Sequence, residues 1–87
     1  MIDDNIKNTI NKVLINDFEI PEDQLIPSAA LFSDLELDSL DIVDLIVALE
    51  KSFKIKIRTE NAEAFRDVRT LEDLYLVVQN MYNQLKD

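Results

Sequence analysis

The sequence predicts a small all-α protein, a four-helix bundle made by a single domain over residues 1–87. It has three longer helices, a short third helix and a long loop after helix one. Three observations support this fold. Eighty-seven residues are enough for one hydrophobic core and rarely for two. Glycine is absent, so tight β-hairpin turns lose the residue that they favour. Apolar residues recur at helical spacing in three stretches of the chain.

Residues 3–16 are expected to form the first helix. Asp3 and Asp4 stand at its start, where negative charge is favoured by the helix dipole. One apolar stripe runs along this segment and consists of Ile2, Ile6, Ile10, Val13 and Leu14.

The segment from Asp17 to Leu37 shows no clean period and contains both prolines, Pro21 and Pro27. A structureless loop of about 20 residues is unusual in a compact domain. We therefore expect its apolar side chains to pin it to the core, with a short turn of helix near Ser28–Phe32. The apolar side chains are Phe18, Ile20, Leu25, Ile26, Leu31, Phe32 and Leu35.

The second helix is expected over Ser39–Phe53. Asp38 is a good N-cap, and Asp41 follows at the spacing at which its carboxylate can bond back to the cap's own N–H. Ser39 would then be the first helical residue, on the exposed rim of the helix start, where its hydroxyl is available for covalent attachment. Apolar residues follow near the helical period at Leu40, Val43, Ile46, Val47, Leu49 and Phe53.

The KIKIRT segment after this helix alternates basic and apolar residues. Because an isolated strand would have no partner, we expect an extended connector with Ile55 and Ile57 turned inward. A short third helix is expected over Glu60–Phe65, presenting Ala62 and Phe65 to the core.

The last helix is expected to begin after Thr70, an N-cap residue that forms a second capping pattern with Asp73. Its apolar face comprises Leu71, Leu74, Val78, Met81, Tyr82 and Leu85.

Composition excludes several classes of protein. Without cysteine or histidine there is no disulfide, thiolate nucleophile, usual zinc site or usual general base, so an enzyme is disfavoured and no metal site is expected. No apolar run approaches the roughly 20 residues of a membrane span, and the N-terminus MIDDNIKN lacks the features of a signal peptide. We expect a free-standing cytoplasmic monomer without membrane insertion.

The net charge of −9 is unevenly distributed. Residues 1–50 carry 12 acidic and 2 basic side chains, whereas residues 51–87 carry 6 acidic and 7 basic ones. An acidic surface repels phosphate backbones, which disfavours nucleic-acid binding, and it attracts partners with basic patches. Solubility alone is an equally simple explanation of the charge.

The stretch DLELDSLDIVDLIVALEKSFKIKI resembles the signature of acyl carrier proteins, in which an Asp-Ser-Leu triplet opens the second of four helices. The long first loop, the short third helix and the VRTLEDL entry to the last helix extend the resemblance over most of the chain. The resemblance implies that Ser39 carries phosphopantetheine, which a transferase takes from coenzyme A. The arm would hold acyl groups as thioesters for fatty-acid, polyketide or related specialised lipid biosynthesis, and the protein itself would catalyse nothing.

The resemblance also implies two further sets of residues. The second helix would dock a phosphopantetheinyl transferase and acyl-transfer or synthase enzymes that present basic patches; this partner surface comprises Asp38, Leu40, Asp41, Val43, Asp44, Val47 and Glu50. An acyl chain could enter the core between the helices, and the candidate lining comprises Leu49, Phe53, Ile57, Ala62, Phe65 and Leu74. These six residues are equally explained as ordinary core.

Three features depart from the family pattern. Glu36 stands where glycine is common, which would cost about 1 kcal/mol if that backbone requires a positive φ. Ile42 occupies a position that is often polar. Four basic residues occupy a region that is usually acidic, which suggests a specialised carrier: Lys51, Lys54, Lys56 and Arg58.

Other functions remain open at the level of sequence. One is an amino-acyl or peptidyl carrier, and another is a helical protein-interaction module whose Ser39 is never modified. A calcium-binding EF-hand is excluded, because a loop counted from Asp34 would place Ser39 at the glycine position and Leu45 at the glutamate position.

Overall fold

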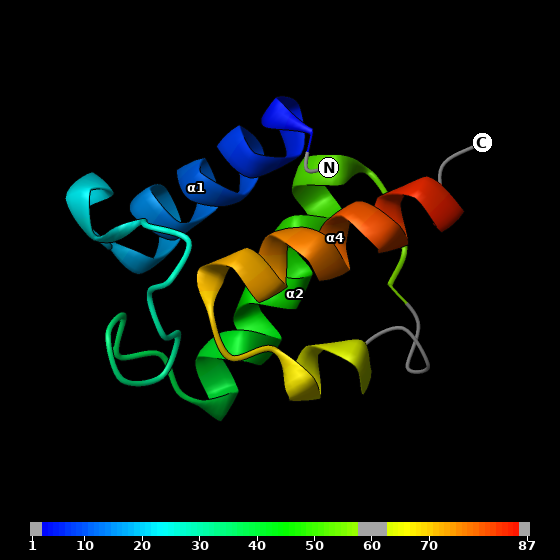
Figure 1. Cartoon of the computed structure of the whole chain (residues 1–87). Coiled ribbons are helices and arrows are strands. Elements are labelled where there is room, and N and C mark those ends of the chain that lie inside the picture. Colours follow the sequence, from blue (N-terminus) through cyan, green and yellow to red (C-terminus); the bar gives the residue numbers. More distant parts are fainter. Residues whose placement is uncertain (1–2, 58–62, 86–87) are drawn as a thin grey trace.

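The computed structural model describes residues 3–57 and 63–85 and is all-helical over these ranges, with no strand. Its elements are α1 (Asp4–Phe18), the 3-10 segment η1 (Glu22–Gln24), α2 (Ser39–Phe53), the 3-10 segment η2 (Glu63–Asp67) and α4 (Leu71–Leu85). The helices α2 and α4 both pack against α1, and η2 packs against α4. Figure 1 shows the long loop that leads from α1 to the start of α2.

The expected four-helix bundle is not confirmed, because the described ranges contain three α-helices. A third helix was expected over Glu60–Phe65. Its first residues, with Ala62, lie outside the described ranges, and the chain from Glu63 to Asp67 forms a 3-10 helix. Phe65 is buried there, as expected.

The first helix begins where its capping residue predicts. The Asp3 carboxylate accepts a hydrogen bond from the N–H of Asn5 at 2.8 Å. This N–H lies in the first turn, where no carbonyl of the helix can accept from it. The helix continues to Phe18, two residues beyond the expected end, and Glu19 closes it in the left-handed conformation (φ 56°). The expected stripe is buried at Ile6, Ile10, Val13 and Leu14.

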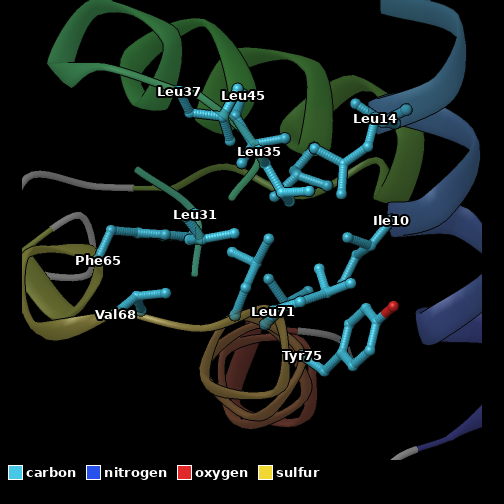
Figure 2. Close-up of a cluster of buried hydrophobic side chains, with 14 of the residues drawn as sticks. Ile10, Leu14, Leu31, Leu35, Leu37, Leu45, Phe65, Val68, Leu71 and Tyr75 are labelled. Atoms are coloured by element: carbon cyan, nitrogen blue, oxygen red, sulfur yellow. The ribbon is translucent and has the colours of Figure 1, made fainter. Parts of the chain in front are cut away.

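One core joins α1, α2, α4, the long loop and η2. Figure 2 shows their side chains meeting in a single cluster dominated by leucine. The face of α2 that enters it differs from the expected stripe, because Leu45 and Leu49 are buried and Ile42, Ile46 and Phe53 pack against them. In contrast, Leu40, Val43 and Val47 are exposed.

The loop is pinned to the core as expected, although by a partly different set of side chains. Its buried residues are Ile20, Ala29, Leu31, Leu35 and Leu37. Ile26 and Phe32, which were expected inside, are 52% and 51% exposed. The helical turn expected near Ser28–Phe32 is also wrong, since the 3-10 helix lies earlier, over Glu22–Gln24.

Backbone hydrogen bonds fasten this loop to the start of α4. Leu31 N–H donates to the carbonyl of Arg69, and Leu71 N–H donates to the carbonyl of Ala29, both at 2.9 Å. Glu72 N–H donates to the carbonyl of Pro27 at 2.9 Å. The loop carbonyls thus satisfy two of the N–H groups that the first turn of a helix leaves unpaired.

The capping pattern predicted at the start of α4 is confirmed. Asp73 N–H donates to Thr70 Oγ1 at 3.2 Å, and Asp73 Oδ2 accepts in return from the N–H of Thr70 at 3.2 Å and of Arg69 at 3.3 Å. These backbone donors stabilise the charged carboxylate and lower the pKa of Asp73 below its usual value of 3.8.

The buried face of α4 follows the prediction at Leu71, Leu74, Val78 and Met81. Tyr82 is half-buried and lies near Phe53, with ring centroids 5.5 Å apart, and the side chain of Leu85 lies outside the description. The prediction missed Tyr75. Its ring is 1% exposed and its hydroxyl donates a hydrogen bond to Asn11 Oδ1 of α1.

Residues 55–57, the described part of the connector after α2, form neither helix nor strand, and Ile55 and Ile57 are half-buried. Lys54 ends the helix in the left-handed conformation (φ 56°). The carboxylate of Glu50 then accepts a hydrogen bond from the N–H of Ile57 at 2.8 Å. This bond holds the connector against the end of α2.

Candidate functional site

The start of α2 has the geometry that the sequence predicts. Asp41 N–H donates to Asp38 Oδ1 at 2.9 Å, and Asp38 N–H donates to Asp41 Oδ2 at 3.1 Å. This reciprocal capping box fixes the first turn of the helix. Ser39 is therefore the first helical residue, and it is exposed.

The exposed serine has unsatisfied donors around it. The N–H groups of Ser39 and Leu40 have no acceptor among the residues described, as the geometry of a helix start dictates. The Ser39 hydroxyl is likewise without a hydrogen-bond partner among them. Unpaired N–H groups and the positive end of the helix dipole favour an anionic group at this position.

An apolar strip runs away from Ser39 along the outer face of α2. Leu40 is 75% exposed, Val43 57% and Val47 44%. Asp44 is exposed beside this strip. Large apolar side chains that remain in water on a small protein mark a surface for contact with another molecule.

The two remaining acidic residues of the expected partner surface differ from Asp44. Asp41 is half-buried, and its carboxylate is engaged in the capping box. Glu50 was expected to point outward, but it is half-buried and accepts the hydrogen bond from Ile57. The carboxylates of Asp41 and Glu50 therefore stabilise the fold through hydrogen bonds to backbone N–H groups. Of the three, only the Asp44 carboxylate forms no hydrogen bond with the residues that the structure describes.

Two clefts flank α2 where it meets the end of α1. One, of about 480 Å³, lies beside the helix start, and its lining includes Asp17, Glu36 and Asp41. The other, of about 340 Å³, runs along the middle of α2, and its lining includes Asp17, Asp44 and Lys51. Phe18 lines both clefts. The sequence did not place Asp17 or Phe18 at the functional site, since no local pattern shows that the last turn of α1 faces α2.

The candidate acyl-pocket residues are divided in the structure. Leu49, Phe65 and Leu74 are buried in the core, and Phe53 and Ile57 pack against it. Ala62 lies outside the described residues. Phe53 also lines a cleft of about 340 Å³ together with Asp3 and Tyr82. Its lining comes from the first turns of α1 and the last turn of α2, so this cleft lies at the other end of α2 from Ser39.

Glu36 has the backbone conformation that glycine favours. Its φ is 58°, in the left-handed region, three residues before Ser39. The Cβ atom of a residue other than glycine is crowded there, at a cost of about 1 kcal/mol. The residue is exposed and lines the cleft beside the helix start.

Among the described residues, no three acidic side chains gather closely enough to hold a metal ion. None of the described helices is both long and apolar enough to cross a membrane.

Comparison with known proteins gives a consistent result. The family model described as "Phosphopantetheine attachment site" matches residues 8–75. Over 70 residues, 80% of this chain and 90% of the relative, the chain is 37% identical to an "Acyl carrier protein" of Buchnera aphidicola subsp. Baizongia pistaciae. It is 29% identical over 76 residues, 87% of this chain and 94% of the relative, to an "Acyl carrier protein" of Syntrophus aciditrophicus.

The strain at Glu36 can be measured. Glu36→Gly is expected to have a free energy of unfolding about 0.5–1 kcal/mol higher than Glu36→Ala, because glycine adopts the positive φ without the Cβ clash. The larger conformational entropy of glycine in the unfolded chain cancels part of the gain. Urea denaturation measures the difference, and charge effects cancel since both variants lack the carboxylate. Equal stabilities would contradict strain at this position.

Proposed function

Because the chain belongs to the acyl carrier protein family, we propose that Ser39 is the residue to which its phosphopantetheine is attached. The chain is a non-catalytic carrier that holds acyl groups on a phosphopantetheine arm. When bound, the arm supplies the thiol that forms thioesters with acyl groups, which a chain without cysteine otherwise lacks. The observation that carries the proposal is the exposed hydroxyl of Ser39 at a helix start fixed by the Asp38–Asp41 capping box.

Exposure alone does not distinguish Ser39 from the other serines, because Ser28, Ser33 and Ser52 are exposed as well. Its position at the start of a helix distinguishes it from them. A phosphodiester on its Oγ would lie near the unpaired N–H groups of the first turn, which typically stabilises it by ~0.3–1 kcal/mol. Neither Ser28 nor Ser33 is in a helix, and Ser52 is in the last turn of α2, at the negative end of its dipole.

The two carboxylates beside the serine oppose the same phosphodiester by like-charge repulsion. They are retained in part because they cap the helix. We propose that they also contact the transferase, whose basic side chains or Mg²⁺ would offset the repulsion. The transferase would then meet a Ser39 hydroxyl whose backbone the capping box already holds in place.

Carriers of this family interact with phosphopantetheinyl transferases and with synthase enzymes. We propose that these partners dock on the outer face of α2 through Leu40, Val43 and Val47, with Asp44 as the main charged contact. An apolar centre with charges at its rim suits a transient complex, in which the charges steer encounter and select the partner. Glu50 is removed from this surface, because it holds the connector.

The remaining expectations belong to the same proposal. We infer that the chain acts as a cytoplasmic monomer, and that η2 takes the place of the short third helix of a four-helix arrangement. The buried side chains of Leu49, Phe65 and Leu74 would have to separate for an acyl chain to enter the core between them.

Loading of the arm tests the attachment site. Incubation of the chain with coenzyme A, Mg²⁺ and a broad-specificity phosphopantetheinyl transferase is expected to add the mass of one arm, measured on the intact protein. Ser39→Ala should show no addition, whereas Ser33→Ala, which removes another exposed serine, should load like the unmodified chain. An arm found on Ser39→Ala, or a natural sequence that stays unmodified with an active transferase, would refute the proposal.

Reversal of one charge tests the docking face. Asp44→Lys is expected to lower kcat/KM for loading by roughly tenfold with a transferase that presents a basic docking face, since an attraction becomes a repulsion. The melting temperature should be unchanged, because the Asp44 side chain forms no hydrogen bond within the described residues. Asp41→Lys is a poorer probe, as it would also break the capping box.

Asp23→Lys is the matched control for Asp44→Lys. Asp23 is exposed in η1, and its replacement changes the net charge by the same amount. If the two variants were slowed equally, net charge rather than local docking would explain the effect.

A further inference from the structure

The outer face of α2 changes the sign of its charge along its length. Asp38, Asp41 and Asp44 lie in its first two turns, and Lys51 lies in its last turn. Lys54 and Lys56 follow directly after the helix end, and all three lysines are exposed. Lys51 lies seven positions after Asp44, which is about two turns or roughly 10 Å of helix.

Within the part of the chain that the structure describes, no carboxylate neutralises the positive charges at this end. None of the three lysines forms an ion pair with a side chain that the structure describes. Glu50 precedes Lys51 in the chain, but its carboxylate is directed to the N–H of Ile57. The lysine charges are therefore available to another molecule.

Both signs of charge meet at one groove. The cleft of about 340 Å³ along α2 is lined by Asp44 and Lys51, with Val47 and Ala48 between them in the helix. Phe18 and a second carboxylate, that of Asp17, line it from α1. The exposed side chains of Leu40 and Val43 extend the apolar strip toward Ser39. An apolar centre with opposite charges at its two ends is a directional surface, because a partner of uniform charge cannot match both ends.

We propose that this surface docks a partner protein that is basic opposite Asp44, apolar in the middle and acidic opposite Lys51, Lys54 and Lys56. This proposal rests on the proposed function and adds to it the charge pattern of the docking face on the enzyme that the carrier prefers. An enzyme with a uniformly basic docking face would meet the three lysines with like charges, which suppresses the wrong partner and slows encounter. The lysine end of α2 thus acts as a specificity determinant for the carrier.

A second copy of the chain fits this surface less well. Two antiparallel copies of α2 would pair the acidic start of one with the basic end of the other. However, each chain has a net charge of −9, and three exposed apolar side chains cover far less than the roughly 800 Å² per partner of a stable interface. A partner protein of complementary charge avoids the repulsion between two chains of net charge −9, and a small apolar area suits a transient complex with it.

Two synthetic amphipathic peptides provide the probe. Both carry the same apolar stripe, and one has arginine along half of its polar face and glutamate along the other half, whereas the other has arginine throughout. We expect Lys51→Glu in the full chain to weaken the Kd of the mixed-charge peptide about fivefold and to tighten that of the basic peptide. Fluorescence anisotropy at low salt measures both constants.

Lys12→Glu is the matched control, since Lys12 is also exposed on a helix and the change in net charge is equal. It should leave the affinity of the mixed-charge peptide within about twofold. Glutamate is disfavoured at the C-terminal end of a helix, so Lys51→Gln serves as a second variant. We expect it to weaken the affinity of the mixed-charge peptide by about half as much as Lys51→Glu does. Thermal melts verify that every variant is folded. Equal Kd values for Lys51→Glu and the natural sequence would overturn the proposal.

A second copy of the chain or a membrane on this surface would give different experimental results from a partner protein. Dimerisation in sedimentation that Lys51→Glu abolishes would assign the surface to a second copy and overturn the proposal. Binding to vesicles with phosphatidylserine that the same variant abolishes would assign it to a membrane and also overturn it. Loading of Ser39 is independent of these readouts, so failure of the carrier proposal would appear as an unmodified serine with the peptide preference intact.

Discussion

The position of Ser39 depends on backbone hydrogen bonds between two segments that are far apart in the sequence. Carbonyls of Pro27 and Ala29 accept from the first turn of α4, and the N–H of Leu31 donates back to residue 69. With the loop fixed in this way, Leu35 and Leu37 enter the core and Asp38 arrives at the start of α2. The capping box then makes Ser39 the first residue of the helix. A loop fixed by hydrogen bonds thus places the proposed attachment site at the start of α2.

The acidic residues around this site divide into two groups. Asp38, Asp41 and Glu50 accept backbone N–H groups and hold the two ends of α2 in place. Asp44 has no such role and is available for contact with other proteins. The Asp38 and Asp41 carboxylates stabilise the start of α2. Their negative charge also repels the phosphodiester that we propose on Ser39. The exposed lysines at the other end show that the charge of the whole surface is not uniformly acidic.

Much of the fold could be predicted from the sequence because its signals are local. Thr70 with Asp73, and Asp38 with Asp41, mark helix starts through contacts over three residues, and both were confirmed. The helical period of α2 by itself mixed surface and core, because Leu40, Val43 and Val47 are exposed, as the predicted partner surface requires, whereas Leu45, which the period did not include, is buried. The loop and the role of Glu50 depend on contacts with distant segments, which no local pattern reveals. The importance of Ser39 came from resemblance to a family rather than from periodicity.

Native-state amide hydrogen exchange tests most directly the claim that a fixed loop delivers Ser39 to the surface. The account predicts that the amides of Leu31, Leu71 and Glu72 are protected to nearly the same degree as those in the centres of α1 and α4. The amides of Ser39 and Leu40 should exchange rapidly, because they have no acceptor among the described residues. Rapid exchange at Leu31, Leu71 and Glu72 would contradict the account, since the loop would then be loose and the start of α2 would not be held in place.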